Sequence, residues 1–167
     1  VVIEDGKSCP ATFQIDMNVC NATDNVQLNF PDAIIPPGTQ VCVPVTVENF
    51  TIFSASFSIE WDELVLQFDS LQNVSSVISP FFGPANLNTL QTSLGLLGVQ
   101  IFDNITPATI TIPNDSVLFE MCFTGIGQLG DCSGLGVTNS PAGVAIEDEM
   151  GLNLALSVDT GRICMAL

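Results

Sequence analysis

Residues 38–50 read GTQVCVPVTVENF and residues 53–62 read FSASFSIEWD, and these two stretches decide the fold. In the first, every odd position from Val41 to Val47 is valine. In the second, the odd positions from Phe53 to Trp61 are apolar, whereas the even ones are Ser, Glu or Asp. A period of two is typical of a strand with one buried face. The two stretches therefore predict two long strands, joined near residues 49–51.

The rest of the chain repeats this pattern. Between Ala11 and Val19 apolar and polar residues alternate, with Phe13, Ile15, Met17 and Val19 on one face. Further strands are expected at residues 26–30, 64–68, 96–102, 109–112, 117–124, 143–146 and 162–167. Gly and Pro separate them, residues 70–93 are expected to be mainly loop, and no segment shows the period of an amphipathic helix. Many short strands with such turns predict an all-β antiparallel sandwich.

Length and charge limit the possible functions. The chain has 167 residues, enough for one domain with a sizeable core. Eighteen acidic side chains face only Lys7 and Arg162, which gives a formal net charge of −16. Such a surface repels phosphate groups, so nucleic acid and anionic membranes are not expected partners. No apolar run is long enough to span a bilayer. The first residues, Val1-Val2-Ile3, are interpreted as a mature N-terminus after removal of a signal peptide, so a secreted protein is expected.

The cysteines indicate disulfides. There are six, without a CxxC pair and without any histidine: Cys9, Cys20, Cys42, Cys122, Cys132 and Cys164. Disulfides in an oxidising compartment therefore explain them better than a zinc site does. Cys42 and Cys122 both lie on the polar side of their predicted strands, so they would meet on the outer face of a sheet if those strands are neighbours. This pair is predicted first, and the connectivity of the others stays open.

Several segments together resemble cohesin-type modules, most closely the cysteine-bearing ones of secreted Bacteroidetes surface proteins. They are PGTQVCVPVTVENF (37–50), FSIEWD (57–62), LVLQF (64–68), SVLFEMCFTGIG (116–127) and GRICM (161–165). The resemblance covers about residues 26–167 and implies a jelly-roll sandwich of about nine strands. In cellulosomes this fold holds a dockerin on one sheet face. Pro44 lacks the N–H of a sheet ladder, so the resemblance implies an unpaired register or a bulge there.

Residues 1–25 lie outside the resemblance and form an N-terminal extension with one extra strand, 11–19. A complete sandwich does not need this strand. It could pair with a free sheet edge of its own subunit or of the next one, and both alternatives remain open. Donation from one subunit to the next does not close into a ring, so it would build a filament.

Glycosylation is a second expectation. The chain carries five N-x-S/T sequons, at Asn21, Asn49, Asn73, Asn104 and Asn114. Ser70 and Ser116 each follow an aspartate and precede an apolar residue, which resembles the O-glycosylation signal of Bacteroidetes. The alternative is that Asn, Ser and Thr simply make up the polar surface of an acidic β protein.

No enzyme is expected. Without histidine there is no Ser-His-Asp or Cys-His machinery. Asp159-Thr160-Gly161 resembles an aspartic-protease signature, yet only six residues follow it, so it is interpreted as a turn. Glu60 and Asp62 lack the aromatic platforms of a sugar-cleaving site. No cofactor is expected, although Ca²⁺ could bind at residues 147–149 or 62–63.

These observations favour a secreted, disulfide-bonded structural protein. The main prediction is a subunit of a glycosylated surface fibre that assembles with itself through β-strand contacts. The alternative is a cohesin-like recognition module whose partner is a dockerin-like surface protein or a carbohydrate.

Overall fold

The computed structural model describes residues 2–3, 11–12 and 25–167. Strand β1 (Val2–Ile3) pairs antiparallel with β2 (Ala11–Thr12), which is the described part of the strand expected at 11–19. Several residues singled out from the sequence lie outside the described part: Cys9, Phe13, Ile15, Met17, Val19, Cys20 and Asn21.

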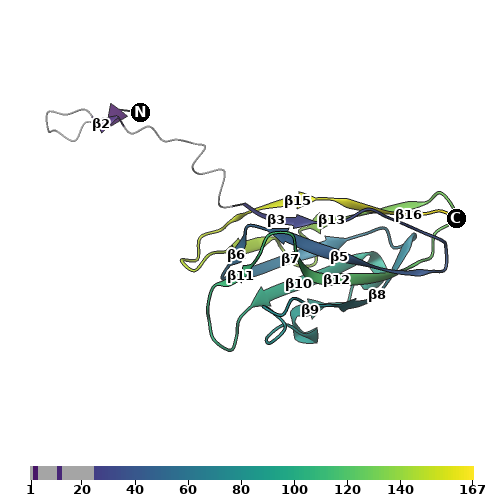
Figure 1. Ribbon diagram of the computed structural model, residues 1–167, viewed down its shortest axis with the longest axis horizontal. Coiled ribbons are helices and arrows are strands. Elements are labelled where there is room, and N and C mark those ends of the chain that lie inside the picture. The colour runs from purple at the N-terminus through teal and green to yellow at the C-terminus, as the bar shows by residue number, and fades with distance from the viewer. Residues whose placement is uncertain (1, 4–10, 13–24) are drawn as a thin grey trace.

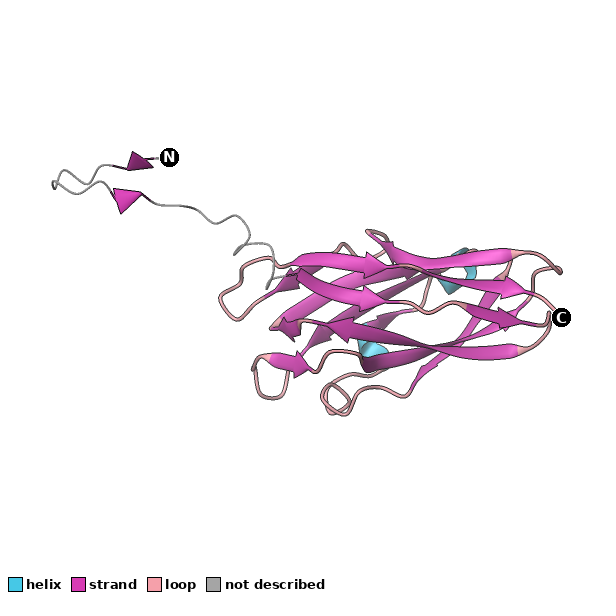
Figure 2. Ribbon diagram, turned by 45° about the horizontal axis from the view of Figure 1, so that its top comes forward, coloured by secondary structure: helices cyan, strands magenta, loops and turns pink. Residues whose placement is uncertain are grey.

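Residues 25–167 form two packed β-sheets (Figures 1 and 2). The five-stranded sheet has the order β15 (Ala155–Asp159), β3 (Asn25–Asn29), β5 (Gln40–Glu48), β12 (Ser116–Gly125) and β8 (Leu66–Gln72). The seven-stranded sheet has the order β4 (Ala33–Ile35), β16 (Gly161–Met165), β13 (Cys132–Thr138), β7 (Ser54–Glu60), β10 (Leu96–Phe102) and β9 (Leu87–Asn88), and β14 (Ala145–Glu147) also pairs with β7. The predicted all-β sandwich is confirmed.

Short elements complete the fold. β6 (Phe50–Ile52) pairs with β11 (Ile110–Ile112), and the 3₁₀ turns η1 (Pro84–Asn86) and η2 (Thr92–Leu94) lie inside the segment expected to be loop. In the described residues no helix has the length and apolar character needed to cross a membrane.

The two stretches that open the sequence analysis become β5 and β7, in opposite sheets. Val43, Val45 and Val47 of β5 are at most 2% exposed, as are Phe57 and Ile59 of β7. Their apolar faces therefore line the core from opposite sides, and the predicted alternation is confirmed. Beside them, the Trp61 ring lies 5.3 Å from the Phe123 ring, centroid to centroid, in an edge-on arrangement.

Two strand pairs depart from the antiparallel expectation. β15 runs parallel to β3, and β16 runs parallel to β4. Residues 25–35 pass from the five-stranded to the seven-stranded sheet, and residues 155–165 make the same passage beside them. Parallel neighbours need no hairpin between them, so no turn signal marks such a pairing in the sequence. β4, β13 and β15 were not predicted, because they are short or, like β13, interrupted by glycine.

The passage between the sheets requires close backbone contact. The Phe30 N–H donates to the Asp159 carbonyl (2.9 Å), and the Arg162 N–H donates to Asp32 Oδ1 (2.8 Å). A Cβ on Gly161 would lie 2.7 Å from the Phe30 carbonyl oxygen and even closer to that of Pro31. Only glycine lets the two chain segments approach this closely.

Pro44 lies in the middle of the five-stranded sheet without costing a ladder bond. It pairs with Glu120, and Cys42 pairs with Cys122 at a Cα–Cα distance of 3.9 Å, as in the close, non-hydrogen-bonded pairs of an antiparallel ladder. The nitrogen of Pro44 therefore faces away from β12. On that side β3 pairs with β5 only as far as Thr46. The unpaired register implied by the resemblance is what the structure contains.

We predict that Gly161→Ala lowers the free energy of unfolding by about 3 kcal/mol, because the added methyl must push apart two backbones. Urea denaturation measures this loss. Gly134→Ala is the matched control, since a Cβ there meets nothing within 4 Å, and it should change the stability by less than about 0.5 kcal/mol. Equal stability of the two variants would contradict the role given to Gly161.

Candidate functional site

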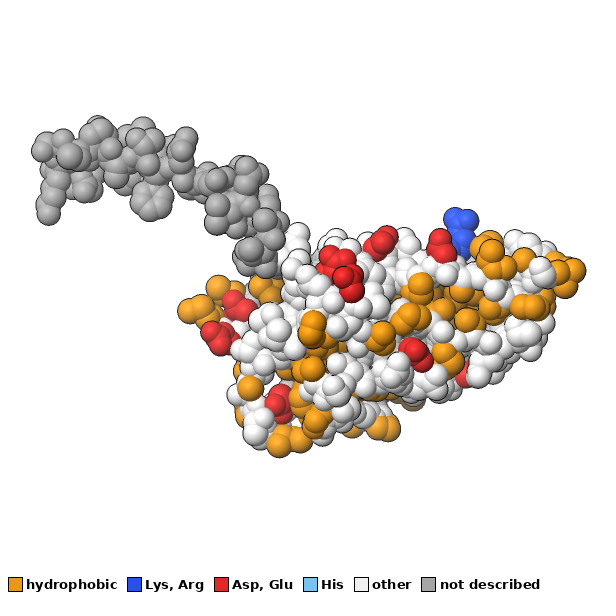
Figure 3. All heavy atoms as spheres, viewed as in Figure 1, with side chains coloured by type: hydrophobic (Ala, Val, Ile, Leu, Met, Phe, Trp, Pro, Cys, Tyr) orange, Lys and Arg blue, Asp and Glu red, His pale blue; other side chains and the backbone are white. Residues whose placement is uncertain are grey.

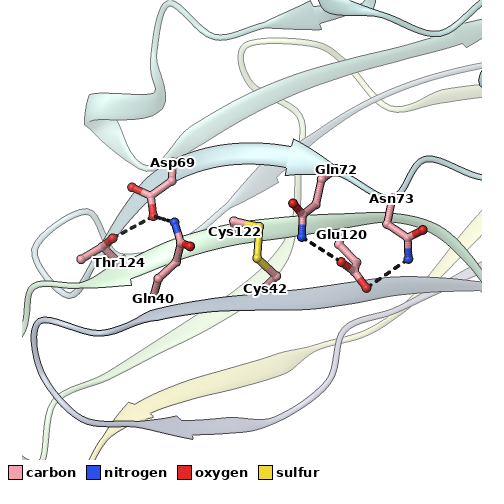
Figure 4. Close-up of a disulfide and its surroundings, with 8 residues drawn as sticks. All are labelled: Gln40, Cys42, Asp69, Gln72, Asn73, Glu120, Cys122 and Thr124. Atoms are coloured by element: carbon pink, nitrogen blue, oxygen red, sulfur yellow. Dashed lines mark hydrogen bonds between the residues drawn. A yellow bond between two sulfur atoms is a disulfide. The ribbon is translucent and has the colours of Figure 1, made fainter.

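The outer face of the five-stranded sheet is centred on a disulfide (Figure 4). Cys42 on β5 and Cys122 on β12 are directly opposite, and their sulfurs are 2.01 Å apart. This is the pair predicted from the phase of the two strands. The bond joins residues 80 positions apart in the sequence and connects the two central strands of the sheet.

Polar side chains on both sides of this disulfide bind one another (Figure 4). Asp69 Oδ2 accepts hydrogen bonds from Gln40 Nε2 (2.9 Å) and Thr124 Oγ1 (2.7 Å). On the other side, the Glu120 carboxylate accepts from Gln72 Nε2 (3.2 Å) and Asn73 Nδ2 (3.1 Å). We call this surface the amide–carboxylate face.

The same face continues onto β3. Gln27 Nε2 donates to Asn29 Oδ1 (2.6 Å), and Asn29 Nδ2 donates to Glu48 Oε1 (3.3 Å). A partner that bound here would have to break bonds that the side chains already make. The polar side chains of the amide–carboxylate face are therefore already bonded to one another.

A second disulfide joins two strands of the seven-stranded sheet. Cys132 on β13 and Cys164 on β16 pair at an S–S distance of 2.12 Å and are 32 residues apart in the sequence. The sequence left this connection open. Disulfides persist in oxidising compartments, so the two bonds are consistent with the expected secreted location.

The outer face of the seven-stranded sheet is built from small residues. We call it the serine–glycine face, and its outward residues are Ser54, Ser56, Ser58 and Glu60 of β7, Gly98 and Gln100 of β10, and Gly134, Gly136 and Thr138 of β13. Ser58 pairs with Gly98 across the sheet, and Glu60 pairs with Gly136. β10 also presents Leu96 and Phe102 on this face, but at Gly98, Gly134 and Gly136 the strand has no side chain of its own to cover the sheet backbone.

A hollow of about 690 Å³ lies at one end of the serine–glycine face. Gly134 and Gly136 are part of its floor, and carboxylates of Asp32, Glu60 and Asp62 are among the groups around it. Arg162, an exposed cation, borders it as well. Figure 3 shows acidic groups on several parts of the surface in view. A side chain from a partner would find room and both signs of charge in the hollow.

A second hollow, of about 320 Å³, lies toward β9 and β10, and Ser56, Asn88, Gly98 and Gln100 are among its lining residues. Residues 141–143 line this smaller hollow as well. Ser58 Oγ donates to the Ala142 carbonyl (3.0 Å) and accepts from the Ala142 N–H (2.7 Å), which fixes this segment on the face. Sequence reasoning missed both hollows, because each depends on residues far apart in the chain meeting in space, such as 32 and 134 in the larger one and 56 and 142 in the smaller one.

The described glycosylation candidates lie on turns and on the rim of the sandwich. Asn49, Asn73, Asn104, Asn114 and Ser70 are exposed, and Ser116 is half-buried. The Asn49 N–H donates to Asn114 Oδ1 (2.8 Å), so two sequons occupy neighbouring turns. Glycosylation itself stays a prediction.

The sequon at Asn104 is held in a compact turn. Asp103 accepts hydrogen bonds from the N–H groups of Ile105 and Thr106 and from the Thr106 hydroxyl. The bond from the Thr106 N–H is the main reason why the pKa of Asp103 lies below its ordinary value of 3.8. The hydroxyl of this sequon is therefore already engaged by a carboxylate.

The two expected calcium-binding segments, residues 147–149 and 62–63, do not form a coordination site in the described part of the chain. In the chain from residue 25 onward, together with residues 2–3 and 11–12, no three His, Cys, Asp or Glu side chains are grouped as a metal site requires. Asp148 Oδ1 instead accepts from the Met150 and Leu152 N–H groups. Asp159 ends β15 and Gly161 begins β16, so the Asp159-Thr160-Gly161 segment belongs to the passage between the two sheets rather than to the turn expected from the sequence.

Solved structures with the same fold are cohesins. A cohesin–dockerin complex from Clostridium thermocellum gives a TM-score of 0.66 at 16% identity, over 84% of this chain and 99% of that chain. The sixth cohesin of scaffoldin B from Acetivibrio cellulolyticus, in complex with a Cel5 dockerin, gives 0.64 at 20% identity, over 84% and 99%. A non-cellulosomal cohesin from Archaeoglobus fulgidus gives 0.65 at 18%, over 86% and 92%.

At these identities the likeness establishes the fold, and the chain is a cohesin-like β-sandwich. No protein-family model matches the sequence. No curated protein sequence matches it either.

The two disulfides should contribute unequally to stability. Loop-closure entropy gives about 4.5 kcal/mol for a loop of 80 residues and about 3.7 kcal/mol for one of 32 residues. We therefore predict that replacing Cys42 and Cys122 by Ala costs about 0.8 kcal/mol more than replacing Cys132 and Cys164. Urea unfolding of the two double variants measures the difference. A larger loss in the second variant would show that local packing, not loop length, sets the contribution.

Proposed function

We propose that this protein is an extracellular recognition module that binds a protein partner on its serine–glycine face. The observation that carries the proposal is the cohesin-like fold, because two of the three cohesins described above were solved with a dockerin bound. A binding role also agrees with a fold used for recognition rather than for catalysis.

The choice of face rests on the difference between the two sheets. The hollows beside Gly134 and Gly98 can receive side chains of a partner, and well-filled pockets dominate the binding energy of protein interfaces. On the amide–carboxylate face, by contrast, Asp69 and Glu120 are already bound by their neighbours. A partner gains more by filling unoccupied space than by replacing existing hydrogen bonds.

Charge limits the chemistry of the partner. The chain has a net charge of −16, and carboxylates of Asp32, Glu60 and Asp62 surround the larger hollow. A complementary surface carries Lys or Arg at the centre of the contact, together with an acidic group that meets Arg162. Attraction between the two surfaces speeds association and weakens with added salt.

The comparisons favour this role over the subunit of a glycosylated surface fibre, which none of the cohesins described above supports. A carbohydrate partner is also less favoured, because those complexes contain protein ligands.

Filling the larger hollow tests the proposal. We predict that Gly134→Leu lowers affinity for the partner at least tenfold and leaves the fold intact, because a side chain there meets open space. The partner is first captured from the secreted proteins of the source organism, identified by mass spectrometry and produced separately. Isothermal titration calorimetry then compares the wild type with the variant.

Thr46→Leu is the control, since it adds a leucine to the opposite face, and it should bind like the wild type. If Thr46→Leu weakens binding and Gly134→Leu does not, the partner uses the amide–carboxylate face. If both variants bind like the wild type, neither face is the binding site.

Glycosylation of the exposed turns is part of the same proposal, because a secreted module would expose these turns to glycosylating enzymes. We predict that native protein carries glycan on Asn49 or Asn114 more readily than on Asn73, whose Nδ2 is bound to Glu120. Peptide mapping of the natively secreted chain measures the occupancy of each site. Unmodified peptides at every sequon would remove glycosylation from the proposal.

A further inference from the structure

The sandwich has two long margins where an edge of one sheet faces an edge of the other. One margin, between β8 and β9, is covered by the chain itself. The Ser75 N–H donates to the Leu118 carbonyl of one sheet (2.9 Å), and Asn86 Nδ2 donates to the Gln100 carbonyl of the other (3.1 Å). Between them Ile78 is fully buried, and the Phe82 ring stacks on Phe119. This cover closes the core on that side.

At the opposite margin the seven-stranded sheet ends in β4 and β16, but β16 pairs with β13 only from Cys132 to Leu135. Residues 136–138 of β13 therefore face β15 without such cover in residues 25–167. We call this margin the β13–β15 seam. Its core-facing residues are only half-buried: Val137 on β13, Leu156 and Val158 on β15, and Leu154 just before β15. The two strands come together at one end, where a Cβ on Gly136 would lie 3.6 Å from Thr160 Cγ2. Apolar groups that belong to the core are thus open to solvent along this seam.

Among the described strands, none pairs with the outer edge of β15 along the seam. β15 is an edge strand, and its Asp159 carbonyl accepts from the N–H of Phe30, which follows β3. Because neighbouring residues of a strand point their N–H and C=O groups to opposite sides, those of Leu156 and Val158 face the seam. The backbone groups of Leu154 point to the same side as those of Leu156 and Val158, and there the Leu154 N–H donates to the Ile146 carbonyl (2.7 Å). Beyond that bond the edge is free to pair with an added strand.

A strand that fits the seam needs apolar side chains at every second position and backbone groups for the free edge. The chain carries such a segment at residues 13–19, where Phe13, Ile15, Met17 and Val19 alternate with polar residues. These residues lie outside the described structure. Seven residues in a strand span about 23 Å, more than the length of β15.

The point at which residues 13–24 join the sandwich argues that the added strand comes from a second molecule. Residues 13–24 lead into Asn25, which pairs with Ala155 at the start of β15. At that end the edge of β15 is occupied by the hydrogen bond from the Leu154 N–H to the Ile146 carbonyl. Residues 13–19 of the same chain would have to cross this bond to reach the free edge. The other end, at the exposed Thr160, opens into the larger hollow. We infer that the β13–β15 seam accepts residues 13–19 of a second copy of this chain as an added strand.

Two double variants test the inference, one on the apolar positions of residues 13–19 and one on the polar positions between them. In the full-length chain, Ile15→Ser with Met17→Ser removes apolar groups from the seam, and Gln14→Ser with Asn18→Ser changes only the polar phase. Sedimentation velocity should show assemblies for the wild type and the polar-phase variant, and monomer for the apolar-phase variant. A wild type that is monomeric at every concentration tested, or equal behaviour of the two variants, would overturn the inference.

Cross-linking identifies which molecule supplies the strand. Met17→Cys and Val158→Cys are placed on separate chains, which are mixed and oxidised. A disulfide-linked dimer on a non-reducing gel, absent when either variant is oxidised alone, is the expected result. A cross-link that forms only when both substitutions are in one chain would assign the seam to the chain's own segment and sink the second-copy inference. Neither result depends on the serine–glycine face, so partner binding and seam occupancy are judged separately.

Discussion

The fold depends on the parallel passage of two distant segments between the sheets. Residues 25–35 and 155–165 each place one strand in the five-stranded sheet and one in the seven-stranded sheet, so they hold the two layers together. The passage works because Gly161 lets its backbone lie against the carbonyls of Phe30 and Pro31. Disulfides then secure strands within each sheet, Cys42–Cys122 in one and Cys132–Cys164 in the other.

This arrangement gives the two outer faces different properties. On the five-stranded sheet, long amide and carboxylate side chains bind one another around a central disulfide, as between Gln40 and Asp69. On the seven-stranded sheet many outward residues are serine or glycine, and hollows form beside Gly98 and Gly134. One surface is therefore satisfied internally, whereas the other has space for a partner. The half-buried seam beside Val158 is a third surface, and its exposure follows from the separation of β13 and β15.

Much of the fold was accessible from the sequence. The alternation in residues 41–47 and 53–61 predicted buried faces that the structure contains, and strand phase predicted the Cys42–Cys122 pair on the condition that their strands are neighbours. The candidate site was not accessible in the same way. Gly134 and Asp32 are about a hundred residues apart, and neither position has a local pattern that marks a binding surface. Glycine at 134 even weakened the strand signal of β13, so the element that forms the floor of the hollow was missed.

The sequence by itself determined the class of the fold, the inward and outward faces of residues 41–47 and 53–61 and the acidic character of the surface, because these properties follow from periodicity and composition within short windows. Only the tertiary structure decided which strands are neighbours, where the chain passes between sheets and which outer face is hollow. The physical reason is that parallel pairing and surface shape arise from contacts between segments such as 25–35 and 155–165, and such contacts leave no periodic signature in either segment alone.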